Sequence, residues 1–263
     1  MRVNDLDFQY PNQAQMFEGL TVSFNSNEIT TIVGPNGSGK STLLHLLSHN
    51  LKPTKGTVYL DQQVLSSYSK KALAKKLATV HQKSTAPEDF TVRDVIACGR
   101  YSYQSMFKPD TDCDTVVTRV MKQLDLLHYA DTPIASLSGG EMQRVYIAMS
   151  LAQEPKYMLL DEPTTFLDLH YQYQVLDIVQ SLKLDHHMTI IMVLHDINQA
   201  LAYSDQIICM RDGRILAQGK PSEVITESLI KDVYQIDAKI IEDDECGMMI
   251  LKKKEGRINE MGN

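Results

Sequence analysis

Short apolar runs alternate with helical patterns along most of the chain. Three runs rich in aliphatic and β-branched residues, Ile29–Val33, Tyr157–Leu160 and Thr189–Leu194, each come before a segment with a helical pattern. This alternation is typical of β-α-β units, in which helices cover a parallel sheet, so it predicts an α/β fold. The predicted helices are Lys40–Ser48, Asp168–Leu182 and Asp196–Tyr203.

Near the N-terminus the apolar segments have a different arrangement. Val3–Phe8, Leu20–Phe24 and Thr57–Leu60 lie close together and are linked by turn-like stretches. Segments connected in this way favour antiparallel pairing. We therefore expect an antiparallel β part beside the parallel core, and a mixed sheet overall.

From about residue 87 to residue 153 the strand signals stop. Val92–Ala97, Thr115–Leu127 and Glu141–Ala152 have helical patterns, and the last of them carries an apolar stripe. Pro133 and the stretch Ser136–Gly140 interrupt the region near its end. These features predict a helical subdomain inserted into the α/β core.

Composition narrows the range of partners. The chain has 263 residues, a net charge of −7 and a pI near 5.6, so no overall cationic field favours nucleic acid as a partner. The N-terminus lacks the pattern of a signal peptide, and no run of about 18 apolar residues occurs, so we expect any role at a membrane to depend on docking to another chain. The cysteines, which form no CxxC pair and are expected to be reduced cytosolic thiols, are Cys98, Cys113, Cys209 and Cys246.

A phosphate-binding loop follows the run Ile29–Val33. The match to GxxxxGK[S/T] stands between a predicted strand and a predicted helix, which is the context that this motif requires. Glycines let backbone N–H groups point at a β-phosphate, while Lys40 neutralises phosphate oxygens and Ser41 binds Mg²⁺. Lys40 is expected to face solvent when no ligand is bound. The motif residues, to which the predicted ATP site adds Thr42, are Gly34, Pro35, Asn36, Gly37, Ser38, Gly39, Lys40 and Ser41.

A predicted apolar strand ends in two carboxylates, Asp161 and Glu162. Asp161 is the acidic partner that a P-loop needs to hold Mg²⁺, and the neighbouring Glu162 points elsewhere and can polarise a water molecule. Acids at a strand end also cap the helix that follows. In combination with the P-loop, the pair favours phosphoryl transfer over capping alone.

A second motif comes about a dozen residues before this strand. The segment Leu137–Arg144 reads LSGGEMQR. Here the sequence resembles the ABC ATPase family, whose LSGGQ signature binds the γ-phosphate of an ATP held by the opposite subunit. The resemblance implies that Ser138, Gly139 and Gly140 contact that phosphate. Glu141 stands where glutamine is commonest in the family, and it also completes a capping box with Ser138; both interpretations can hold.

The resemblance covers nearly the whole chain and implies roles for four further residues. Tyr10 matches the aromatic residue that stacks on adenine, and Gln82 matches the glutamine that reaches Mg²⁺ and senses the transmembrane partner. Asp168 matches the D-loop, which lies across the dimer interface. His195 matches the histidine that contacts the γ-phosphate and the attacking water. The seven other histidines lack such a context.

Domain organisation and partners also follow from the resemblance. It implies ATP and Mg²⁺ as ligands, a homodimer in which each P-loop faces the partner's signature, two membrane-spanning permease subunits and, indirectly, an extracytoplasmic substrate-binding protein. The chain itself is expected to be peripheral, at the cytoplasmic face of the cell membrane. Within an ABC ATPase domain at 1–240, we expect the P-loop core at 1–86 and 154–220 and the helical subdomain at about 87–153. Residues 221–263 are expected to be C-terminal helices and a tail packed on the core.

The cargo is inferred from resemblance alone. Four segments are similar to the ATPases of bacterial importers for ferric siderophores, haem and cobalamin, and ferric siderophore is the closest match. Because the ATPase does not touch the cargo, haem and cobalamin stay open as alternatives. The segments are Thr91–Val95, Gly99–Tyr101, Ile147–Gln153 and Val193–Ala200.

Other classes of ABC protein fit the sequence less well. Translation-linked ATPases carry two cassettes, and only one P-loop is present here. DNA-repair ATPases insert a long coiled coil, whereas Lys40 and Ser138 are only 98 positions apart (138 − 40). Exporters commonly fuse the ATPase to membrane helices. A nucleotide-binding regulator without hydrolysis is disfavoured because Glu162 and His195 are both present.

Overall fold

A mixed sheet forms the centre of the protein, as predicted. The computed structural model describes residues 1–82, 86–104, 109–244 and 247–253. The strands of the sheet, in order across it, are β10 (Arg214–Gly219), β9 (Gln206–Arg211), β3 (Ile29–Val33), β8 (Thr189–Val193), β7 (Tyr157–Asp161) and β6 (Leu77–Val80). β10 is antiparallel to β9, and the other neighbours are parallel. Every residue of β3, β7 and β8 is buried, which is expected for parallel strands covered on both faces.

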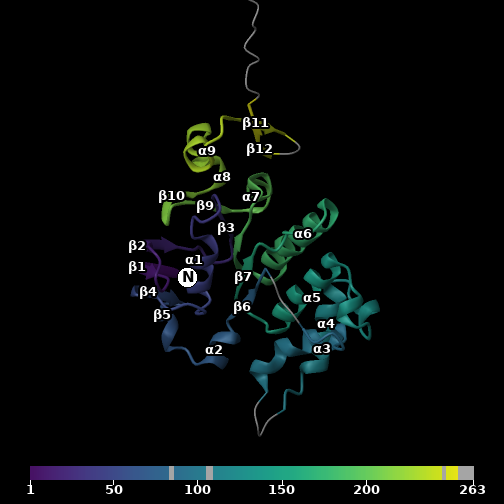
Figure 1. Cartoon of the computed structure of the whole chain (residues 1–263). Coiled ribbons are helices and arrows are strands. Elements are labelled where there is room, and N and C mark those ends of the chain that lie inside the picture. Colours follow the sequence, from purple (N-terminus) through teal and green to yellow (C-terminus); the bar gives the residue numbers. More distant parts are fainter. Residues whose placement is uncertain (83–85, 105–108, 245–246, 254–263) are drawn as a thin grey trace, which may run out of the picture.

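A smaller antiparallel sheet lies beside the main one (Figure 1). Its strands, in order, are β2 (Gln15–Ser23), β1 (Arg2–Gln9), β4 (Lys55–Leu60) and β5 (Gln63–Val64). Helix α1 (Lys40–Leu47) packs against both sheets, since its Leu43 shares one buried core with Leu6 of β1 and Ile191 of β8. The antiparallel β part is therefore confirmed, and α1 is held firmly from two sides.

Helices gather beside the opposite edge of the main sheet, next to β6 (Figure 1). They are α3 (Val92–Cys98), α4 (Cys113–Gln123) and α5 (Gly139–Ala152), with the 3₁₀ turns η2 (Gly99–Tyr103), η3 (Leu127–Tyr129) and η4 (Ile134–Ser136). Between residues 86 and 153 the described residues form no strand, and an isolated bridge joins Thr91 to Pro133. The structure thus contains the helical region that the sequence predicts.

The remaining helices of the core follow the β-α-β pattern. α6 (Leu169–His186) comes after β7 and α7 (Ile197–Tyr203) after β8, while α2 (Lys70–Ala74) and the turn η1 (Leu65–Ser67) precede β6. In a sheet of this kind the loops after the carboxyl ends of parallel strands meet at one edge. The predicted P-loop, the two acids and His195 all lie on such loops.

The C-terminal part differs from the expected helices and tail. Two short helices, α8 (Pro221–Val224) and α9 (Glu227–Tyr234), lead into an antiparallel hairpin of β11 (Ala238–Asp243) and β12 (Gly247–Lys252). The hairpin is fixed to α7 because the amide of Asn198 bonds both the backbone N–H (2.8 Å) and the carbonyl oxygen (3.3 Å) of Ile250. The expected C-terminal helices are therefore present, but the segment after them is a β-hairpin where a tail was expected; residues 254–263 lie outside the described part.

None of the helices in the described ranges combines the length and the hydropathy needed to cross a membrane.

Candidate nucleotide-binding and hydrolysis site

The P-loop joins the end of β3 to the start of α1 through backbone conformations that favour glycine. Gly34, Gly37 and Gly39 have φ angles of +151°, +79° and +100°. A side chain at Gly34 would place its Cβ 2.1 Å from the carbonyl oxygen of Met210, and one at Gly39 would lie 2.7 Å from the Phe17 ring. The loop is thus packed tightly against β9 and against Phe17 of β2, and it leads directly into the N-terminus of α1.

Lys40 is buried, so the expectation that it faces solvent without a ligand is wrong. Its side chain is only 5% exposed, and Nζ donates hydrogen bonds to the carbonyl oxygens of Gly34 (2.9 Å) and Pro35 (3.1 Å). The ammonium thus has two carbonyl acceptors within the loop, as a buried cation requires, and the Pro35 carbonyl also accepts from the N–H of Ser38 at 3.2 Å. Burial lowers the pKa of Lys40, while the carboxylates of Glu162 and Asp161 act in the opposite direction. The cation is therefore held in place within the loop.

Asp161 and Ser41 form a pair that fits Mg²⁺. The Ser41 hydroxyl donates to Oδ1 of Asp161 at 3.1 Å, and Asp161 is 6% exposed at the end of β7. Burial raises the pKa of Asp161, whereas the hydrogen bond from Ser41 lowers it. A hydroxyl and a carboxylate oxygen side by side are the hard oxygen donors that Mg²⁺ prefers, so the residues present suit this ion.

Glu162 turns away from Asp161 and joins two other loops. Its φ angle of +51° directs the carboxylate to Gln82 and His195. Nε2 of Gln82 lies 2.5 Å from Oε2, and Nε2 of His195 lies 2.6 Å from Oε1. The structure therefore brings Glu162, Gln82 and His195 together, and it places Gln82 beside the carboxylate of Glu162.

One residue of this cluster was missed by sequence reasoning. Thr165 donates its hydroxyl to Oε2 of Glu162 at 3.2 Å. The signal available in the sequence is a threonine three residues after an acid in a loop, a spacing at which hydroxyl groups often close local turns. Thr165 orients the carboxylate together with Gln82.

The signature segment forms a well-capped helix terminus. Ser138 is the N-cap of α5, its Oγ accepts from the N–H of Glu141 (3.4 Å), and Oε2 of Glu141 accepts from the N–H of Ser138 (2.8 Å). The capping box is confirmed. Hydrogen bonds from the Tyr129 hydroxyl and from Ser138 lower the pKa of Glu141 to about 2. Gly140 packs against Tyr171, while Ser138 and Gly139 are exposed at the helix start.

Within the described residues, no hydrogen bond or ion pair of the structure joins residues 138–141 to the P-loop. Two further residues of the predicted site, Tyr10 and Asp168, lie at the starts of helices. The Tyr10 hydroxyl is 3.1 Å from Oγ1 of Thr42, which places Tyr10 at the start of α1. Asp168 caps α6 by accepting from the N–H of Tyr171 at 3.1 Å, and the adjoining Phe166 is 84% exposed.

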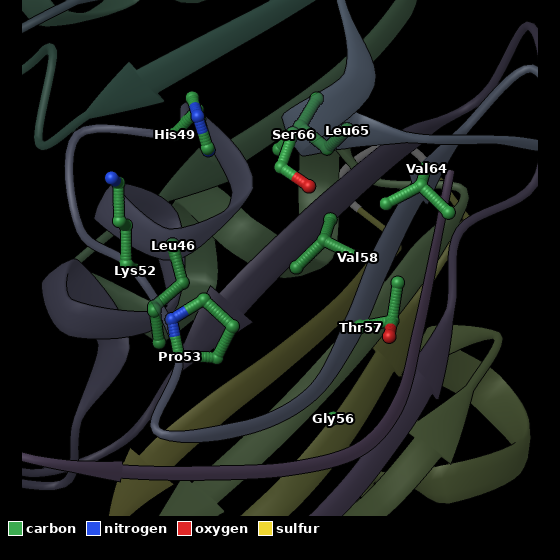
Figure 2. A pocket seen from close by; sticks show the side chains of 10 residues that line it. All are labelled: Leu46, His49, Lys52, Pro53, Gly56, Thr57, Val58, Val64, Leu65 and Ser66. Atoms are coloured by element: carbon green, nitrogen blue, oxygen red, sulfur yellow. The ribbon is translucent and has the colours of Figure 1, made fainter.

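A separate hollow of about 330 Å³ lies at the far end of α1 (Figure 2). Leu46 and Val58 form part of its wall, with His49 and Lys52 nearby. It contains none of the predicted site residues, because they surround the N-terminus of α1 rather than its C-terminus. The hollow is therefore separate from the candidate site.

Comparison with known proteins agrees with this geometry. The family model described as ABC transporter matches residues 17–165. The ferric enterobactin transport ATP-binding protein FepC of Escherichia coli (strain K12) is 42% identical over 231 residues, covering 88% of this chain and 85% of that protein. The iron(3+)-hydroxamate import ATP-binding protein FhuC of Bacillus subtilis (strain 168) is 40% identical over 227 residues, covering 86% and 84%.

Solved structures are similar as well. The structure of a putative metal-chelate type ABC transporter in an inward-facing conformation has a TM-score of 0.83 at 27% identity, covering 96% of each chain. The dimeric post-hydrolysis state of the ATP-binding cassette MJ0796, bound to ADP and Pi, has a TM-score of 0.73 at 25% identity, covering 84% of this chain and 98% of that one.

Proposed function

Because this chain belongs to the ABC transporter family and is an ATPase of that family, we propose that it powers the import of a ferric siderophore. The observation that carries the proposal is the similarity, over most of both chains, to ATP-binding proteins for ferric enterobactin transport and iron(3+)-hydroxamate import. Haem and cobalamin are the alternative cargoes, since the site itself contacts only nucleotide.

The active unit is proposed to be a head-to-tail homodimer. The P-loop and the signature share no hydrogen bond among the described residues of one chain, yet each presents a helix N-terminus suited to phosphate. Two chains facing each other supply both termini to one ATP. The dimeric form of the similar cassette MJ0796 supports this arrangement.

The cluster around Glu162 is proposed to carry out hydrolysis. Its carboxylate orients and deprotonates the attacking water, with Gln82 and His195 holding it from two sides at 2.5 and 2.6 Å. His195 also reaches the γ-phosphate. Lys40 stabilises negative charge on the phosphates from within the loop. Ser41 and Asp161 would hold Mg²⁺, which supplies charge neutralisation at the phosphate oxygens, and Gln82 is a proposed third ligand.

The remaining site residues bind the nucleotide in this proposal. Tyr10 stacks on the adenine, and Thr42 with the P-loop amides contacts the phosphates. Ser138, Gly139 and Gly140, with Glu141 beside them, contact the partner's γ-phosphate. Asp168 lies across the dimer interface. These assignments rest on the family motifs and on the positions described above.

The proposed partners are two membrane-spanning permease subunits, with the ATPase at the cytoplasmic face of the membrane and a substrate-binding protein outside. ATP contacts favour only the closed dimer, so nucleotide occupancy shifts the population and moves the permease between its two forms. Gln82 is the proposed relay, because it stands between Glu162 and the helical subdomain.

Uptake of a radiolabelled ferric siderophore tests the cargo. Cells that lack this chain and any compensating paralogue should lose uptake, regain it with the wild-type gene, and fail to regain it with the Glu162→Gln gene. Parallel assays with labelled haem and cobalamin separate the alternatives. Normal ferric siderophore uptake in the deletion strain contradicts the iron cargo, whereas the ATPase assignment is tested on the purified protein.

A further inference from the structure

Two glutamine side chains form a hydrogen-bonded chain behind the hydrolysis site. Nε2 of Gln199, on α7, donates to Oε1 of Gln172, on α6, at 2.6 Å. Nε2 of Gln172 in turn donates to the carbonyl oxygen of Leu167 at 2.9 Å. At the other end, the Thr164 hydroxyl donates to Oε1 of Gln199 at 3.4 Å. Thr164 and Leu167 both belong to the D-loop segment Thr164–Asp168, so the two amides join this one loop to α6 and to α7.

Both ends of this chain lie in the D-loop, and its middle lies at the helix that follows His195. Leu167 directly precedes Asp168, the residue of the D-loop that caps α6. Gln199 lies in the first turn of α7, where its N–H bonds the carboxylate of Asp196 at 3.2 Å, and Asp196 follows His195. The amides therefore run from the D-loop to the helix whose start fixes His195.

Because part of this chain is buried, its polar groups depend on one another. Gln199 is 3% exposed and Thr164 is 7% exposed, so an amide there is stabilised only when its partners are present. An apolar residue of similar size would fill the same space without needing partners. Farther along the D-loop Phe166 is 84% exposed, and Leu169, at the start of α6, is 66% exposed.

We propose that Gln172 and Gln199 are positioning residues that couple contact at the D-loop to the placement of His195. The proposal rests on the homodimer proposed above, in which the D-loop meets the second subunit. A shift of the Leu167 carbonyl changes the orientation of Gln172, and Gln172 changes that of Gln199 because they share a short hydrogen bond. The start of α7, and with it His195, then moves to or from Glu162.

Steady-state ATPase assays with isosteric variants test the relay. Gln199→Met and Gln172→Met remove the amides, and Gln172→Glu keeps an acceptor for Gln199 but no donor for Leu167. Gln180, an exposed residue of α6, offers the matched control Gln180→Met. We expect kcat to fall roughly 2–30-fold in all three relay variants, while KM for ATP stays close to wild type. The thermal unfolding midpoint of Gln172→Glu should also stay close to wild type.

The double variant Gln172→Met/Gln199→Met distinguishes a relay from two separate structural effects. If the amides act as one chain, kcat of the double variant equals that of the more affected single variant. Effects that multiply, a loss confined to KM, or unchanged kcat in Gln172→Glu and Gln199→Met would each overturn the proposal. The homodimer is checked separately, by testing whether the Glu162→Gln protein dimerises with MgATP. If it dimerises but the relay variants keep full kcat, the relay is rejected and the homodimer stands. If it never dimerises, the homodimer itself is rejected.

Discussion

The P-loop side and the signature side of the site differ in how much of their chemistry one chain completes. On the P-loop side, Lys40 comes from the start of α1 and Asp161 and Glu162 from the end of β7, and all three have polar partners within 3.1 Å. On the signature side, Ser138 and Glu141 bond each other, and the helix start remains exposed. One chain is enough to arrange the residues of the P-loop side, whereas the signature side is an exposed surface that a second chain can contact.

The burial of the two sides shows the same contrast. Asp161 is 6% exposed and Lys40 is 5% exposed, because buried parallel strands deliver them to the sheet edge. The D-loop between the two sides presents Phe166 with a φ angle of +67° and an exposed ring. Substitutions on the P-loop side should therefore alter chemistry, and those on the signature side should alter association and local stability.

The largest effect is expected from Glu162→Gln. The amide keeps the shape and an acceptor but cannot take a proton from water, so kcat should fall roughly 10²–10⁴-fold. ATP affinity, measured by isothermal titration, should stay near wild type. Glu223→Gln on α8 replaces an exposed acid and serves as the control, with no loss expected. Wild-type kcat in Glu162→Gln would remove Glu162 from the chemistry.

A smaller effect, on ATP affinity, is expected from Lys40→Ala. Removing the cation should weaken ATP binding about tenfold or more by isothermal titration, since no other lysine lies in the P-loop. The carbonyls of Gly34 and Pro35 each lose the hydrogen bond from Lys40, and Pro35 keeps only the one from the N–H of Ser38, so the thermal unfolding midpoint should fall as well. ATP affinity that stays within a factor of about two would contradict the P-loop assignment, because tenfold corresponds to 1.4 kcal/mol.

Gly140→Ala tests the packing behind the signature. A Cβ there would lie 2.4 Å from the Tyr171 ring, so we expect the free energy of unfolding in urea to fall by about 1–3 kcal/mol. Gly139→Ala is the matched control, because its Cβ would meet Leu167 at 3.6 Å, an ordinary contact. Equal stability of the two variants would show that Tyr171 does not limit this position.

The smallest effect concerns the charge of Glu141. Its pKa is lowered to about 2 from 4.5, so its contribution to stability is full above pH 4.5 and is lost as the pH falls toward 2. Glu141→Gln should therefore reduce the free energy of unfolding by roughly 0.3–1 kcal/mol near neutral pH, and less under acid conditions. Urea unfolding of both proteins across this range measures the difference. A difference in unfolding free energy between the two proteins that grows as the pH falls would contradict this prediction.

Much of the site was predictable because its signals are local. The P-loop, the acids after β7 and His195 after β8 follow buried strands whose continuous apolar runs are visible in the sequence. The capping box of Ser138 and Glu141 is likewise a short-range pattern. The predicted strand Ile29–Val33 agrees with β3 residue for residue.

The remainder depends on contacts between distant segments. Lys40 is buried because the loop folds back over it, which a motif match does not show. The hairpin of β11 and β12 consists of two six-residue strands, and its position depends on the packing of Ala238 and Ile250 in the main core and on the hydrogen bonds of Asn198 on α7. The bond between Gln172 and Gln199 joins two helices separated by β8. Such contacts emerge only when the chain is folded.

The state of association of Glu162→Gln tests most directly whether the signature side is completed by a second chain. Size-exclusion chromatography with light scattering should show a homodimer in MgATP and a monomer in ADP. Adding Ser138→Arg, which puts a bulky cation at the exposed start of α5, should abolish the dimer while isothermal titration still detects ATP binding. A dimer that survives Ser138→Arg, or a Glu162→Gln protein that binds MgATP and stays monomeric, would contradict the shared site.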